Sequence, residues 1–211
     1  MIRRVLVVAA ALALTFAGFA PARAAKLAKG NCEIWVGLNG NRSHILTPPA
    51  SISSLGEENE VGVHVAGSYF LTDAWAGVLS FGYDVGRQKF EPAAGTESKF
   101  ESSSYNVRLG LDRYAFINDA VALYAGPGIF YWKGKASDTN ILSPGVKTDW
   151  PDVTEWAFNG RIGMYARLGS HYGLFGHIGQ VIGSNSGEDA AGKVSWWSSH
   201  HEGSVGLALD F

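Results

Sequence analysis

The stretch WWSSHHEG, residues 196–203, holds the densest group of side chains in the sequence that could perform chemistry. A hydroxyl, an imidazole and a carboxylate, such as Ser198, His200 and Glu202, form a nucleophilic site when hydrogen bonds join them in a fixed order. Successive residues of a strand point to opposite faces, however, so His200 and His201 cannot both face one site. The stretch therefore predicts a polar edge between a loop and a strand, and we expect no catalytic residue in it.

The remaining histidines and the single cysteine do not suggest a metal site. His64, His171 and His177 are scattered, without the spacing of a metal-ligand set. Cys32 alone cannot form an internal disulfide. The glycine-rich YAGPG, residues 124–128, lies inside a predicted strand and precedes no helix, so it does not qualify as a phosphate-binding loop. We expect no metal and no cofactor.

A second group of polar residues recurs at alternate positions along much of the chain. Charged groups enclosed in a narrow interior must be paired and hydrogen-bonded, since isolated buried charges are very costly. Two interpretations follow: a salt-bridged polar plug that fixes strand register, or a narrow or gated solute path lined by the same residues. The ionisable members are Glu33, His64, Asp84, Arg108, Asp112, Arg161, Arg167, Glu202 and Asp210.

The elements that position these residues are β-strands, because apolar residues recur with period two and no segment keeps a helical period. The connections alternate: short polar turns follow the second, fourth and sixth strands, whereas long polar loops follow the others. This layout predicts an eight-stranded antiparallel up-and-down barrel, either of the outer-membrane type or lipocalin-like. The predicted strands are 32–41, 60–70, 74–86, 101–114, 120–134, 154–168, 171–183 and 200–211.

The other face of the strands decides between these two barrels. It is apolar, and its aromatic residues gather near the two ends of the strands. Trp75 and Tyr83 are eight residues apart, about 26 Å along a strand and about 20 Å along a tilted barrel axis, close to the height of an apolar membrane band. We therefore predict a transmembrane barrel with the apolar face outside. The predicted girdle residues are Tyr69, Trp75 and Phe211 at the short-turn end, and Tyr83, Tyr105, Tyr131 and Trp156 at the long-loop end.

The stretch 171–183 fits this pattern poorly. Tyr172 and Ile178 suggest one apolar face, but Gln180 interrupts that face and Phe175 with Val181 falls on the opposite one. A β-bulge would reconcile the two sets. Closure of the sheet further requires the last strand to pair with the first, because unpaired backbone groups facing lipid cost several kcal/mol each.

The N-terminal residues predict export. Residues 1–24 combine Arg3 and Arg4 with an apolar run and a small-x-small site, as in a cleavable signal peptide. Residues 25–211 would then form one barrel domain. Cleavage removes three arginines, which leaves 14 basic against 19 acidic residues, so a nucleic-acid partner is not expected.

Three segments, SYFLTDAWAGVLSFGYD (68–84), YAFINDAVALYAGPGIFYW (114–132) and the terminal GLALDF, resemble the small eight-stranded outer-membrane barrels of Gram-negative bacteria. The similar groups are the OmpA-type transmembrane domain, the OmpW type and the porin-like surface antigens. The resemblance spans essentially the mature chain, but its motifs are generic to these groups. It implies outer-membrane location, both chain ends in the periplasm, contact with outer-membrane lipid and lipopolysaccharide, and recognition of Phe211 by the barrel-insertion machinery.

The expected function is a non-catalytic structural or surface role, with narrow passage of small solutes left open. One alternative is a small channel or a transporter of hydrophobic molecules, to which the apolar residues of loop 42–59 would contribute. A second alternative is an enzyme that modifies lipid A, but the His-x-Ser-Asn arrangement of the deacylase type is absent. The sequence leaves the solute, the surface ligand and the oligomeric state open.

Overall fold

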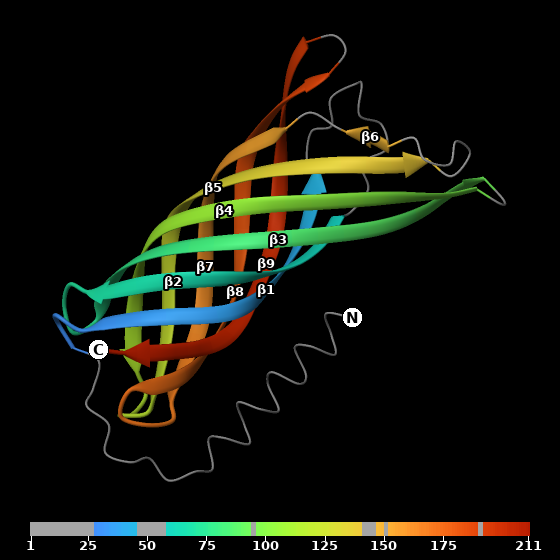
Figure 1. Ribbon diagram of the computed structural model, residues 1–211. Helices are drawn as coiled ribbons and strands as arrows, with labels where there is room; N and C mark the ends of the chain where they lie inside the picture. Colours follow the sequence, from blue (N-terminus) through green and yellow to red (C-terminus); the bar gives the residue numbers. More distant parts are fainter. Residues whose placement is uncertain (1–27, 46–57, 94–95, 141–146, 150–151, 190–191) are drawn as a thin grey trace.

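The computed structural model describes residues 28–45, 58–93, 96–140, 147–149, 152–189 and 192–211. The predicted signal peptide and most of loop 42–59 lie outside these residues. Long strands wind around a common axis (Figure 1), and no described residue belongs to a helix long and apolar enough to cross a membrane. The strands are β1 (Cys32–Ile45), β2 (Glu58–Phe70), β3 (Trp75–Ala93), β4 (Thr96–Phe116), β5 (Val121–Asn140), β6 (Lys147–Asp149), β7 (Val153–Arg167), β8 (Tyr172–Asp189) and β9 (Gly192–Asp210).

Eight of the strands close into a ring, as predicted. All neighbouring strands pair antiparallel in the order β4-β3-β2-β1-β9-β8-β7-β5, and β4 also pairs with β5. At the seam, the Phe211 N–H donates to the Cys32 carbonyl at 2.9 Å, and the Cys32 N–H donates to the Phe211 carbonyl at 3.2 Å. Among the described residues, the short strand β6 pairs with β5 alone. It lies within a segment that we expected to be loop.

The short turns all lie at one end of the barrel, near the C-terminus (Figure 1). Side chains of the turns bind the following backbone, which explains their composition. The Thr72 hydroxyl accepts from the Trp75 N–H at 3.0 Å, and the side-chain Oδ1 of Asn118 accepts from the Val121 N–H at 2.9 Å. We call this the short-turn end and the opposite one the long-loop end.

The register determines how wide the lumen is. Register pairs can be followed from strand to strand around the whole barrel. Starting at Ser195 on β9, they pass through Lys133 on β5 and Tyr83 on β3 and return to β9 at Val205. The offset between start and end is ten residues, which is the shear of the barrel. Eight strands with a shear of ten imply a tilt of about 40° and a backbone radius of about 8 Å. Such a lumen has room for side chains and little else.

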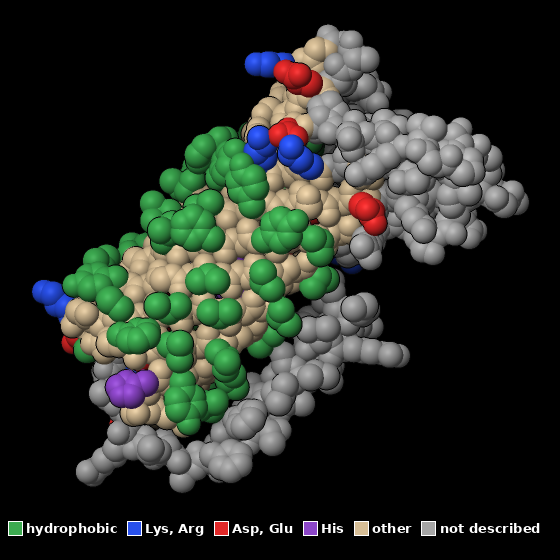
Figure 2. All heavy atoms as spheres, viewed as in Figure 1, with side chains coloured by type: hydrophobic (Ala, Val, Ile, Leu, Met, Phe, Trp, Pro, Cys, Tyr) green, Lys and Arg blue, Asp and Glu red, His purple; other side chains and the backbone are tan. Residues whose placement is uncertain are grey.

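The apolar face of the strands points outward. On β1, Ile34, Val36 and Leu38 are exposed, whereas the alternate residues Glu33 and Trp35 are buried. Hydrophobic side chains cover the visible wall of the barrel, and the visible charged ones gather towards its two ends (Figure 2).

The predicted bulge in the seventh barrel strand is wrong. β8 pairs with both β7 and β9 in continuous register, without a shift. Phe175 and Val181 are buried in the lumen, and Gln180 is exposed on the outer wall. The alternation is therefore regular, and the residue types misled us because large apolar side chains occupy the lumen face here.

Candidate functional site

The structure places all nine predicted lumen residues on the inner face of the barrel. Eight are buried and Glu202 is half-buried. They do not form one continuous network; they fall into separate groups at different heights along the barrel axis, separated by apolar side chains.

The middle group is built around Asp112 on β4. The Arg161 guanidinium donates to both carboxylate oxygens of Asp112, and its Nε lies 3.1 Å from Oδ2. Arg108 Nη2 donates to Oδ1 of the same carboxylate at 3.3 Å. One buried carboxylate thus binds two buried arginines through charge-assisted hydrogen bonds, which are stronger than neutral ones.

A second carboxylate balances this group. Arg108 Nε donates to Asn159 Oδ1 at 3.0 Å, and Asn159 Nδ2 donates to Glu202 Oε1 at 3.2 Å. The two arginines therefore meet two carboxylates, one directly and one through an amide. The Arg161 guanidinium also lies 5.1 Å from the ring centroid of Trp35, within the range of a cation–π contact.

A separate group lies at the short-turn end. Arg167 binds the Asp210 carboxylate at 2.8 Å, and the Tyr165 hydroxyl donates to the same carboxylate at 2.8 Å. Glu33, the register partner of Asp210, accepts from the Ser68 hydroxyl at 2.9 Å and from the Trp35 indole at 3.2 Å. These bonds join β1 to β2 on one side of the closing seam and β7 to β9 on the other.

An aromatic cluster fills the lumen between these groups, and our sequence reasoning did not predict it. Trp35 lies between Phe175, at 4.9 Å between ring centroids, and Tyr124, at 5.4 Å. The sequence could have indicated the cluster, because these aromatic residues lie on the same faces of their strands as the charged residues that we predicted to line the lumen. We assigned aromatic residues only to the outer wall and did not examine the inner positions. The cluster comprises Trp35, Ala66, Phe70, Ala76, Val78, Tyr114, Ala122, Tyr124, Tyr165, Phe175 and Ala208.

Glycines on the inner face leave space for these rings, which gives a test of the packing. A Cβ on Gly163 would come within 2.6 Å of both the Tyr124 hydroxyl and the Gly176 carbonyl oxygen. Gly160 on the same strand faces outward, with nothing within 4 Å of such a Cβ. We expect Gly163→Ala to lower the free energy of unfolding by about 1–3 kcal/mol, as overpacking does, and Gly160→Ala to change it little. Denaturant titration of the refolded protein measures both; equal effects would contradict the packing.

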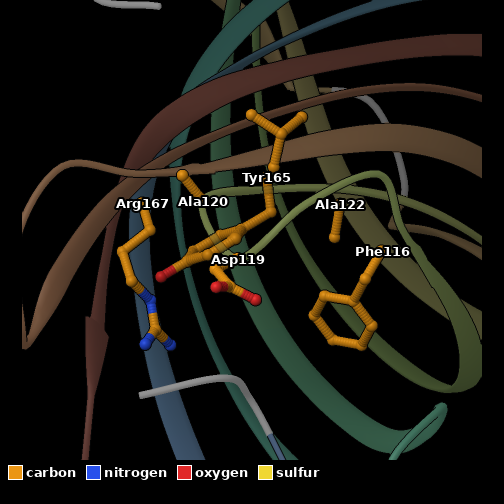
Figure 3. Close-up of a pocket in the computed structure, with 7 residues that line it drawn as sticks. Phe116, Asp119, Ala120, Ala122, Tyr165 and Arg167 are labelled. Carbon is orange, nitrogen blue, oxygen red and sulfur yellow. The ribbon is translucent and has the colours of Figure 1, made fainter. Parts of the chain in front are cut away.

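A shallow recess opens near the short-turn end, with an empty volume of about 160 Å³ that includes open solvent. Figure 3 shows Phe116, Asp119, Tyr165 and Arg167 around it. Tyr165 and Arg167 are already engaged with Asp210, and no water-sized space is enclosed. The recess therefore offers no ligand site.

Carboxylates near the long-loop end are held by amides and hydroxyls. Asp84 accepts from the side-chain amides of Asn39 and Asn106, the second at 2.7 Å. Glu60 accepts from the Ser102 hydroxyl at 3.2 Å. Among the described residues, Asp84 has no arginine or lysine partner, and the two amide hydrogen bonds satisfy this buried carboxylate.

The structure also brings together a serine, a histidine and a carboxylate near this end. The Ser198 hydroxyl lies 3.0 Å from His200 Nε2 and 2.9 Å from Glu155 Oε1. Glu155 Oε2 lies 2.7 Å from the same Nε2, and His200 Nδ1 has no hydrogen-bond partner among the described residues. In a catalytic triad the acid binds Nδ1 and the serine binds Nε2. This arrangement is therefore a polar cluster without the order of a triad, and Glu155 is a member that the sequence did not reveal.

His201 faces outward, away from His200, as strand alternation requires. Among the described residues, no group of three or more His, Cys, Asp or Glu side chains is placed to hold a metal ion.

The predicted girdle residues lie on the outer wall. Tyr131 is half-buried and the other six are exposed. At the long-loop end, Tyr131 lies 4.8 Å from Trp156 and 6.4 Å from Tyr105 between ring centroids, so these rings form a continuous band. Phe211, 69% exposed, ends the chain at the seam; its recognition by the insertion machinery stays a prediction.

Comparisons with known proteins agree with this architecture. The model of the outer membrane protein beta-barrel domain matches residues 9–211. The crystal structure of OprG from Pseudomonas aeruginosa is similar with a TM-score of 0.58 and 13% identity, over 87% of this chain and 97% of that one. The crystal structure of Ail, the attachment invasion locus protein of Yersinia pestis, gives 0.50 and 17%, over 87% and 99%. At these identities the likeness shows the fold alone. No curated protein matches the sequence.

Proposed function

This chain belongs to the outer membrane protein beta-barrel domain family, and we propose that it acts in the outer membrane as a closed, non-catalytic barrel with a structural and surface role. We further propose that the short-turn end faces the periplasm and the long-loop end the exterior, the layout of even-stranded barrels of this kind. The barrel would then hold its long loops at the cell surface.

The observation that carries this proposal is the packing of the lumen at mid-height. The rings of Tyr124, Trp35 and Phe175 pack against one another across it and are each at most 2% exposed. Beside them lies the pair of Arg161 and Asp112, which is equally buried. A solute would have to displace aromatic rings and separate a buried ion pair, and breaking such a pair costs several kcal/mol. The packing of the lumen therefore supports a closed plug and argues against a permanently open solute path.

The absence of triad order in the Ser198 group supports a non-catalytic role, because His200, which would activate the serine, has no carboxylate of the described residues on Nδ1. The small-channel alternative differs from the proposal in one measurable property, which is conductance.

Single-channel recording of the refolded protein in planar bilayers tests the closed barrel. We expect no discrete openings from the wild type. The variant Trp35→Ala/Arg161→Ala, which removes the centre of the plug, should conduct because it leaves a polar gap that water can fill. The matched control Val36→Ala, which changes the neighbouring outward residue, should stay silent. Regular openings of the wild type would contradict the proposal.

A further inference from the structure

Two buried acidic side chains face each other across the closing seam at the short-turn end. Glu33 on β1 and Asp210 on β9 are register partners, and they are 1% and 5% exposed. Next to them, Cys32 and Phe211 exchange both of their backbone hydrogen bonds. Pairs alternate along an antiparallel ladder, so Glu33 and Asp210 form the kind of pair whose backbone groups do not bond each other and whose side chains come closest. Their Cβ atoms are therefore about 5 Å apart.

The two carboxyl groups share one cation among the described residues. Asp210 Oδ2 lies 2.8 Å from Arg167 Nη2 and accepts from the Tyr165 hydroxyl, also at 2.8 Å. Glu33 Oε2 accepts from neutral groups instead. These donors are the Ser68 hydroxyl at 2.9 Å, the Trp35 indole at 3.2 Å and the Tyr114 hydroxyl at 3.3 Å. Two ionised carboxylates directly opposite each other would destabilise the strand pair, and a buried charge without a cation is very costly.

The other side chains around this pair supply no second positive charge in the part of the chain that the structure describes. The phenols of Tyr114 on β4, Tyr124 on β5 and Tyr165 on β7 face Glu33, and phenols are neutral at ordinary pH. Arg161 binds Asp112 in the middle group. The exposed His171 meets Asp210 through its backbone carbonyl. The remaining neighbours do not titrate; they are Ser68 and Phe70 on β2, Ala76 and Val78 on β3, and Phe175 on β8.

One oxygen of each carboxyl group has no donor. These oxygens are Glu33 Oε1 and Asp210 Oδ1, and both are buried. The two side chains are nevertheless within hydrogen-bonding reach of each other. An ionised carboxylate can only accept hydrogen bonds, whereas a protonated one also carries an O–H donor. A single proton between the two groups would therefore satisfy both oxygens and remove one of the two negative charges.

We propose that Glu33 and Asp210 form a proton-binding site, in which Glu33 is protonated at neutral pH and its Oε1–H donates to Asp210 Oδ1. Asp210 keeps the negative charge because it faces Arg167. The proton is taken from water when the seam closes, and it returns to water at alkaline pH. Two negative charges then face each other across β1 and β9, so the site couples closure of the barrel to pH. It lies apart from the mid-height plug, so this inference goes beyond the proposed function and does not depend on whether the barrel conducts.

The site predicts how stability depends on pH. In the unfolded chain a glutamate releases its proton near about pH 4, whereas the folded barrel retains the proton on Glu33. Above that pH the folded state binds one more proton than the unfolded state, so raising the pH favours unfolding. The unfolding equilibrium constant should rise by up to about tenfold per pH unit from this site, until the folded pair ionises as well.

Equilibrium unfolding in denaturant from phospholipid vesicles, between about pH 5 and about pH 9, tests this dependence. The variant Glu33→Gln has an amide that can donate to Asp210 Oδ1 without a titrating proton, so the contribution of the site to the pH slope should vanish. The matched control is Glu188→Gln, which removes an exposed carboxyl group from β8 and should keep the slope of wild type. Equal slopes of wild type and Glu33→Gln would overturn the proposal.

Infrared difference spectra between light and heavy water detect the proton itself in the folded wild type. With isotope-labelled glutamate, we expect the carbonyl band of a protonated carboxylic acid at neutral pH to shift with the label. The band should be lost in Glu33→Gln and kept in Glu188→Gln. Absence of the band from wild type would overturn the proposal even if Glu33→Gln did not fold, and so would persistence of the band in that variant.

A metal cation between the two oxygens is the competing explanation. It requires sodium or calcium ions to stabilise wild type at constant pH and to leave Glu33→Gln unchanged. We expect the same small effect of these salts on both proteins. A stabilisation specific to wild type would assign the two oxygens to a metal ion and would overturn the proton-binding site.

Discussion

Replacing Asp112 with asparagine is expected to lower the free energy of unfolding by about 3–5 kcal/mol, the usual cost of removing one partner of a buried ion pair. Asp112 is fully buried and binds both Arg108 and Arg161. Among the described residues, the variant leaves the two guanidinium groups with Glu202, reached through Asn159, as the remaining carboxylate of this group. Equilibrium unfolding in denaturant from phospholipid vesicles measures the loss.

Asp152 provides the control, because it also binds two cations but lies at the surface. Its carboxylate contacts Lys133 at 2.9 Å and Lys135 at 3.5 Å, and the hydrogen bond from Lys133 lowers the pKa of Asp152. Solvent screens such pairs, so Asp152→Asn should unfold nearly as wild type does. If Asp112→Asn also matched wild type, the middle group would contribute nothing to stability, and our account of the plug would be wrong.

The second large effect is expected on the opposite face of the same strand. Leu109 is 61% exposed on the outer wall and pairs with Leu79 and Ile129, far from both aromatic bands. Leu109→Arg should lower the free energy of unfolding in vesicles by about 2–4 kcal/mol, because a charge near the bilayer midplane loses its hydration.

The matched control is Tyr105→Arg, four residues nearer the long-loop end on the same face of β4. At the interface the arginine reaches water and headgroups, so the expected cost is at most about 1 kcal/mol. The difference between the losses of unfolding free energy in the two variants therefore reports how deep each position lies in the membrane. Equal costs at both positions would show that the outer wall of β4 does not cross a bilayer in the way described.

The strands and their two faces could be predicted from the sequence because each is a local property. Period-two alternation along 101–114 places Arg108 and Asp112 on one face and Leu109 on the other without any knowledge of neighbouring strands. The parity of short and long connections then fixes the order of the strands in the ring. Alternation within strands and the parity of connections apply to any closed sheet that separates lipid from a filled interior.

The contents of the lumen were harder to predict, since they depend on which strands meet across the barrel. Asp112 and Arg161 are far apart in sequence, and only the register brings them together. The same holds for Ser198 and Glu155. The stretch 171–183 looked irregular because Phe175 was judged as a lipid-facing residue. Its actual place, against Trp35, becomes visible only when β8 and β1 are set on opposite sides of β9.

The sequence by itself determined the fold class, the outer wall and nine of the ionisable residues of the lumen, because the alternation of inward and outward residues is a property of each strand on its own. Only the tertiary structure decided that these residues form distinct groups around an aromatic cluster, and that Glu33 and Asp210 face each other across the closing seam. The physical reason is the shear. The ten-residue shear of the closed sheet determines which side chains lie at the same height along the barrel axis, and it cannot be inferred from any one strand.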